Sequence, residues 1–150
     1  MKAIWIVAAS VVALGLAGCE KPSEEVAAPV AKKSLARQAQ FYAGQEQVTS
    51  VDSGVVEKGS APGTLLLKAD GKVPSAGYTD AGFKPRVYAA APADGIYEVD
   101  VVATKPAAPA AAAITAIHVE GAWPGYNQDR LKGVKFIART NEVTAMLPPG

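Results

Sequence analysis

The chain has 150 residues, and its 15 Lys and Arg side chains nearly balance its 14 Asp and Glu side chains. A nucleic-acid-binding domain usually carries an excess of basic residues on one face, so this balance argues against that class of protein. Hydrophobic residues make up 49% of the chain but aromatic residues only 7%, and much of the apolar fraction is alanine, which predicts one small domain of about 100 residues.

The first 18 residues show the three zones of an export signal. Lys2 gives a basic start, an apolar run extends from Ala3 to about Leu16, and the small residue Gly18 ends the segment. The run is shorter than the roughly 20 apolar residues that a helix needs to cross a bilayer. We therefore expect residues 1–18 to be a cleaved signal peptide rather than a permanent anchor.

The tetrapeptide Leu16-Ala17-Gly18-Cys19 resembles the lipobox of bacterial lipoproteins. In that class the cysteine thiol receives diacylglycerol, signal peptidase II cleaves just before the cysteine, and the new amine is often acylated. Two or three acyl chains hold a protein stably on a membrane, whereas one gives marginal binding. The resemblance therefore implies cleavage between Gly18 and Cys19, lipidation of Cys19 and no other cofactor. The alternative is an ordinary secretory signal with an incidental cysteine.

The residues after Cys19 bear on location and reach. In enteric lipoproteins an Asp directly after the cysteine retains the protein in the inner membrane, so by resemblance Glu20 favours the outer membrane, facing the periplasm. Residues 19–46 are expected to form a flexible tether, since Pro22 and Pro29 break any helix in its charged first half. Ser34–Phe41 has the pattern of a short helix within it.

Beyond the tether, short apolar runs alternate with turn residues, which predicts a mainly β domain over residues 47–147, followed by a tail at 148–150. The chain has one cysteine and therefore no internal disulfide to hold this domain. The spacing favours a small Ig-like β-sandwich, or a related barrel, of about seven strands: Val48–Glu57, Thr64–Lys68, Phe83–Ala89, Gly95–Thr104, Ile114–Glu120, Gly133–Arg139 and Val143–Leu147.

Turn residues and low complexity separate these strands. Asp70-Gly71 and Asp94-Gly95 have the sequence of tight turns, and the first predicts a hairpin over Ala69–Lys72. Pro74, Pro85 and Pro92 confine their neighbours to edges or loops, because proline cannot donate to a central ladder. The alanine-rich insert that begins at Lys105 predicts a mobile loop, with a short helix as the alternative.

A stretch of about 27 residues is similar to a segment of small uncharacterised exported bacterial β proteins. It runs from Gly77 to Ala103, and the residues that carry the similarity are Gly77–Thr79, Arg86–Tyr88 and Pro92–Ala103. The resemblance implies a β fold and export, and it implies no particular activity.

Three polar residues are candidates for catalysis, and each has a plainer interpretation. Glu98 and Asp100 alternate with Tyr97, Val99 and Val101, which predicts a wet face on this strand. Paired carboxylates can serve acid/base chemistry or hold Ca²⁺, but more often they face Lys or Arg across a sheet. His118 is the single histidine and has no serine in a nucleophile context near it, so a solvent-facing strand position is favoured over catalysis or metal binding.

The segment Gly121–Gln128 is the candidate for ligand binding. Trp123 and Tyr126 lie between glycine and proline residues, in a loop that could present flat apolar surface to a sugar, a peptide or peptidoglycan. The alternative is that Trp123 folds back and closes one end of the sandwich. No glycine-rich phosphate loop is present, so we expect no nucleotide partner.

These features together predict a membrane-anchored envelope lipoprotein with a non-catalytic interaction or structural domain. An envelope protein or peptidoglycan is the expected partner. A periplasmic ligand-binding module and a periplasmic hydrolase using Glu98, Asp100 or His118 are the alternatives.

Overall fold

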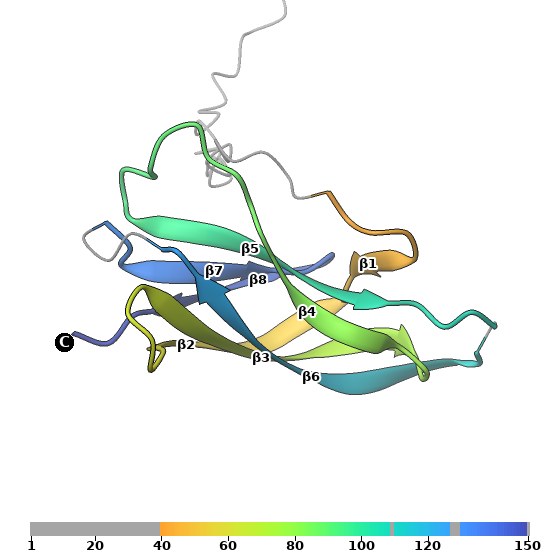
Figure 1. Cartoon of the computed structure of the whole chain (residues 1–150). Helices are drawn as coiled ribbons and strands as arrows, with labels where there is room; N and C mark the ends of the chain where they lie inside the picture. Colours follow the sequence, from red (N-terminus) through yellow and green to blue (C-terminus); the bar gives the residue numbers. More distant parts are fainter. Residues whose placement is uncertain (1–39, 109, 127–129, 150) are drawn as a thin grey trace, which may run out of the picture. The chain divides into compact units, whose positions relative to one another are not determined.

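The computed structural model describes residues 40–108, 110–126 and 130–149, and within these ranges the chain forms strands and no helix (Figure 1). The predicted mainly β fold is therefore confirmed. The helix expected at Ser34–Phe41 lies almost wholly outside the described residues. The strands are β1 (Gln45–Gln47), β2 (Ser50–Lys58), β3 (Thr64–Ser75), β4 (Thr79–Pro85), β5 (Ile96–Thr104), β6 (Ala112–Pro124), β7 (Gly133–Ile137) and β8 (Glu142–Met146).

The strands form two separate sheets. One sheet has five strands: four follow the order β1-β5-β7-β8, and the fifth, β4, also pairs with β5. The other sheet has three strands in the order β2-β3-β6. Most described pairs are antiparallel, but β5 and β7 run parallel, from Ile96 opposite Gly133 to Asp100 opposite Ile137. This parallel pair, which the spacing of strands along the chain does not predict, places β7 beside the central strand β5, and β8 follows at the edge of the sheet.

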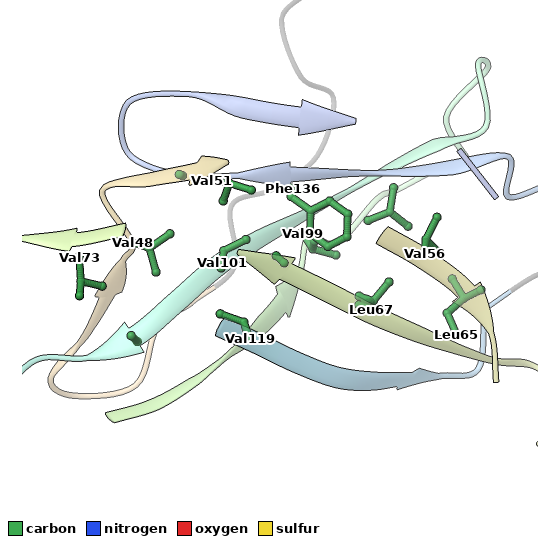
Figure 2. Close-up of a cluster of buried hydrophobic side chains, with 14 of the residues drawn as sticks. Val48, Val51, Val56, Leu65, Leu67, Val73, Val99, Val101, Val119 and Phe136 are labelled. Carbon is green, nitrogen blue, oxygen red and sulfur yellow. The ribbon is translucent and has the colours of Figure 1, made fainter. Parts of the chain in front are cut away.

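The core lies between the sheets and consists of small aliphatic side chains around one aromatic ring (Figure 2). Phe136, Leu65 and Leu67 are the largest fully buried apolar side chains, and valines supply most of the remainder. The Phe136 ring packs edge-on against Phe83 at 5.5 Å between ring centroids. It also lies directly over Gly54 of β2, where an added Cβ would be 2.5 Å from the ring.

The chain crosses from one sheet to the other between β1 and β2, and the turn between β7 and β8 holds this crossing. The backbone N–H groups of Arg139 and Thr140 donate to the carbonyls of Val48 and Thr49, each at 3.0 Å. The Asn141 side chain accepts from the Val51 N–H at 2.9 Å and donates to the Val51 carbonyl at 2.7 Å. Asn141 thus occupies the place that a neighbouring strand would take beside Val51.

The hairpin predicted over Ala69–Lys72 is wrong, because β3 continues through it. Gly71 is buried and opposite Val51, next to an irregularity in the β2–β3 register between Val51 and Ser53. A Cβ at Gly71 would collide with the Ser50 carbonyl oxygen. Glycine is therefore needed here for close approach of two strands and not for a turn.

Other boundaries also moved. The strand predicted at Phe83–Ala89 begins earlier and ends at Pro85, whereas β6 starts inside the alanine-rich insert and runs on through Pro124. The turn predicted at Asp94-Gly95 is confirmed: Gly95 has φ +75°, and the Asp94 carboxylate accepts the Ile96 N–H at 3.0 Å. Pro74 falls where the β3–β6 register shifts, so it interrupts no regular ladder.

Candidate functional site

The two carboxylates predicted for the wet face of β5 are enclosed instead. Asp100 is 0% exposed and Glu98 keeps only 12% of its side-chain surface. The wet-face prediction is therefore wrong for Asp100, although the alternation that places both residues opposite the core valines is correct. Val102, two residues further on the same face, is also fully buried.

Arg86 accounts for the burial of these charges. Its guanidinium binds Asp100 through two bonds, from Nε at 2.9 Å and from Nη2 at 2.8 Å, and its Nη1 lies 3.2 Å from Glu98. The Gln47 side-chain amide donates to Asp100 as well, at 2.6 Å. Asp100 thus accepts three hydrogen bonds, and its bond with Arg86 raises the pKa of that guanidinium further. The plainer interpretation, carboxylates facing an Arg across the sheet, is confirmed.

Tyr88 extends this cluster on the connection between β4 and β5. Its hydroxyl oxygen accepts the backbone N–H of Glu98 at 3.0 Å, and its ring packs edge-on against Tyr97. Burial, reinforced by the negative charge of Glu98, raises the pKa of Tyr88 to about 12. The group is therefore neutral in the physiological range and acts as a hydrogen-bond acceptor for the strand.

His118 lies on the outer face of the small sheet in a surface chain of polar groups. Its Nδ1 is 2.7 Å from an Asp70 carboxylate oxygen, and the Ser53 hydroxyl donates to the other oxygen of Asp70 at 2.9 Å. The side chains of His118 and Asp70 are each 61% exposed. The hydrogen bond with His118, then that from Ser53, lowers the pKa of Asp70.

This arrangement differs from a Ser-His-Asp catalytic triad in its connectivity. In a triad the serine hydroxyl contacts the imidazole, which takes its proton, and the carboxylate orients that imidazole. Here Ser53 and His118 both bind Asp70, so the hydroxyl donates to the carboxylate and not to the imidazole. The solvent-facing strand position predicted for His118 is confirmed.

Trp123 and Tyr126 lie on a strand end and the turn after it. Gly121–Pro124 belong to β6, so the predicted loop begins four residues later than expected. Both aromatic side chains are partly buried and pack against the core, and Trp123 meets Tyr97 edge-on at 6.1 Å. This matches the alternative in which Trp123 closes one end of the sandwich, while both residues keep some exposed surface.

A further polar cluster, which sequence reasoning missed, joins three segments near the other end of β5. The Tyr78 hydroxyl donates to Glu46, and Arg139 lies 3.2 Å from the same carboxylate. The bond to Glu46 raises the pKa of Tyr78. These residues are far apart in the sequence, as are Arg86 and Gln47, so no local pattern could have brought them together.

Gly18 and Cys19, the predicted cleavage and lipidation residues, lie outside the described residues. In the part of the chain that is described, no helix is long and apolar enough to cross a membrane. The same part contains no group of three or more His, Cys, Asp or Glu side chains placed to hold a metal ion.

Comparison with known proteins adds no family assignment. The chain matches no protein-family model, no curated protein and no solved structure.

Proposed function

We propose that the protein is a bacterial envelope lipoprotein, anchored by lipid on Cys19, whose β domain is a non-catalytic interaction or structural module. The observation that carries the proposal is the sequence Leu16-Ala17-Gly18-Cys19 at the end of a short apolar run, in a chain with no second cysteine. The thiolate is the nucleophile that lipidation requires. By resemblance to the sorting rule of enteric lipoproteins, Glu20 favours the periplasmic side of the outer membrane, and the proline-containing tether would lift the domain off that membrane.

The state of the polar candidates supports a non-catalytic domain. A general acid or base must reach the proton that it transfers, within about 3 Å or through one water. Asp100 is fully buried and already accepts three hydrogen bonds. The exposed His118 is bound to Asp70, and no serine hydroxyl donates to its ring in the described residues. The strongest polar cluster of the domain therefore serves the fold.

The test is lipid labelling in a bacterial host. Cells that express the chain are fed an alkyne fatty acid and fractionated, and the mature N-terminus is identified by mass spectrometry. We expect label on Cys19, cleavage after Gly18 and recovery in the membrane fraction. Cys19→Ala should lose both the label and the cleavage after Gly18, whereas Ser23→Ala, a nearby change outside the tetrapeptide, should behave as wild type. Equal labelling of Cys19→Ala and wild type would refute the anchor.

A ligand-binding module is the second candidate, because Trp123 and Tyr126 retain exposed surface at one end of the sandwich. Removal of residues 1–18 would take away Trp5 and leave Trp123 as the single tryptophan. Its fluorescence should then respond to peptidoglycan fragments or peptides if this end binds them. An unchanged fluorescence spectrum across such a panel would exclude the ligand-binding module and favour the structural role of Trp123.

A further inference from the structure

A pocket of about 290 Å³ lies where the turn before β5 meets the segment before β7. Among the described residues its lining combines small apolar residues with two cationic ones and includes no Asp or Glu: Ala91, Pro92, Ala93, Gly95, Arg130 and Lys132. The turn is at the same end of the sandwich as the β2–β3 turn (Figure 1). Neither the lipid anchor nor the aromatic pair of the proposed function uses this pocket.

The two cations of the pocket differ from most basic residues of the domain. Five other described Lys and Arg side chains are paired with carboxylates, as Lys68 is with Glu57 and Lys135 with Glu142, whereas Lys58, Lys84 and Lys105 are not. In the described ranges, Arg130 and Lys132 have no carboxylate within ion-pair distance. Two like charges that share one pocket repel each other, and a bound anion would relieve that repulsion.

Hydrogen bonds hold the backbone around the pocket. The Gly95 N–H donates to the Pro92 carbonyl at 3.0 Å, and the Gly95 carbonyl accepts the Lys132 N–H at 2.8 Å. The nearby Asp94 carboxylate is held by the Ile96 N–H at the start of β5. A Cβ at Gly95 would be 2.6 Å from the Arg130 carbonyl, so the two walls approach as closely as glycine permits.

We infer that this pocket binds a phosphate group carried on an organic stem. A phosphate monoester has about −1.5 to −2 charges near neutral pH, which matches the two cations. Arg and Lys are the usual donors to phosphate oxygens, and the Ala and Pro side chains offer apolar contact to the stem. Free phosphate esters and lipid headgroups share this chemistry. Because the cations are exposed, we expect dissociation constants of about 1–10 mM for phosphate alone.

The experiment is an NMR titration of the full chain, ¹⁵N-labelled and purified in a nonionic detergent, at pH 7.5 and low ionic strength. Inorganic phosphate is one probe and dihexanoyl phosphatidate, a monoester with apolar chains, is the other. The backbone amides of Gly95 and Lys132 report the pocket. The test variant is Arg130→Gln with Lys132→Gln, and the matched control is Lys58→Gln with Lys105→Gln, which removes two other described cations without ion-pair partners.

We expect saturable shifts of the Gly95 and Lys132 amides, a loss of affinity of about tenfold or more in the pocket variant and less than about twofold in the control. Tighter binding of phosphatidate than of inorganic phosphate would identify a lipid headgroup as the source, and equal binding would contradict the organic stem. The inference is overturned if neither probe gives saturable shifts, or if both double variants lose affinity equally, since that would be general charge attraction. Neither result would affect the labelling test of Cys19.

Discussion

The ion-pair cluster on β5 makes Arg86→Met the sharpest test of how this domain is stabilised. Methionine has a similar length but no charge, so it leaves Asp100 buried at 0% exposure with Gln47 as its remaining described donor, and Glu98 beside it. Removing one partner of a buried ion pair costs about 3–5 kcal/mol. A domain of this size has a total free energy of unfolding of about 5–15 kcal/mol, so the variant should be close to unfolding.

The control is Lys84→Met. Lys84 is opposite Asp100 in the β4–β5 register, but its ammonium lies over the Tyr42 ring at 3.6 Å and forms no ion pair with a described carboxylate. We expect it to cost about 1 kcal/mol or less. Asp100→Leu should cost less than Arg86→Met because Glu98 remains to pair with Arg86, and the double variant Arg86→Met, Asp100→Leu should recover part of the loss.

Urea unfolding followed by circular dichroism measures these differences, because a change in midpoint at constant slope reports stability. The reasoning would be refuted if Arg86→Met fell within about 1 kcal/mol of wild type, or if Lys84→Met were equally costly. Either outcome would mean that groups other than Arg86 stabilise the buried charge of Asp100.

Two further predictions concern the core and the titration of the domain. Gly54→Ala should destabilise the domain by about 1–3 kcal/mol, because its methyl group would meet the Phe136 ring at 2.5 Å. In a chain that also carries Phe136→Leu the alanine should cost less. If urea unfolding showed that the two changes are additive, this contact would be contradicted. In an ultraviolet titration, one tyrosine should ionise near pH 12, and this ionisation should be absent in Tyr88→Phe. Folding raises the pKa of Tyr88 above its usual value of about 10, so its contribution to the free energy of unfolding is complete below pH 10 and is lost as the pH rises toward 12. If wild type and Tyr88→Phe lost stability equally above pH 10, this prediction would be wrong.

Local periodicity was enough to find β5, β7 and β8 of the larger sheet. In β5 and β7, alternate residues such as Val99 and Phe136 enter the core, and this pattern needs no knowledge of the partner strand. The same alternation misjudged Asp100, because its burial depends on Arg86 from the preceding connection and on Gln47 from β1. Charge burial is a property of contacts between segments, and one strand alone does not encode it.

The two Asp-Gly pairs show the same limit at the level of turns. Asp94-Gly95 forms the expected turn with a positive φ, whereas Asp70-Gly71 lies within β3. The dipeptides are identical, and the difference is the Ser50 carbonyl that approaches Gly71 from β2. The His118–Asp70–Ser53 chain follows from this extended β3, so a predicted hairpin at the same place concealed it.

The bond between Asn141 and Val51 also governs when the domain can fold. These residues are 90 positions apart, and β1 and β2 meet partners from the far end of the chain through the same turn. Contacts of such separation are slow to form, because the chain between them must be ordered first. The pairing of β2 with β3 needs only residues up to Ser75, but the crossing between β1 and β2 gains its hydrogen bonds to Arg139, Thr140 and Asn141 only when almost the whole chain is present.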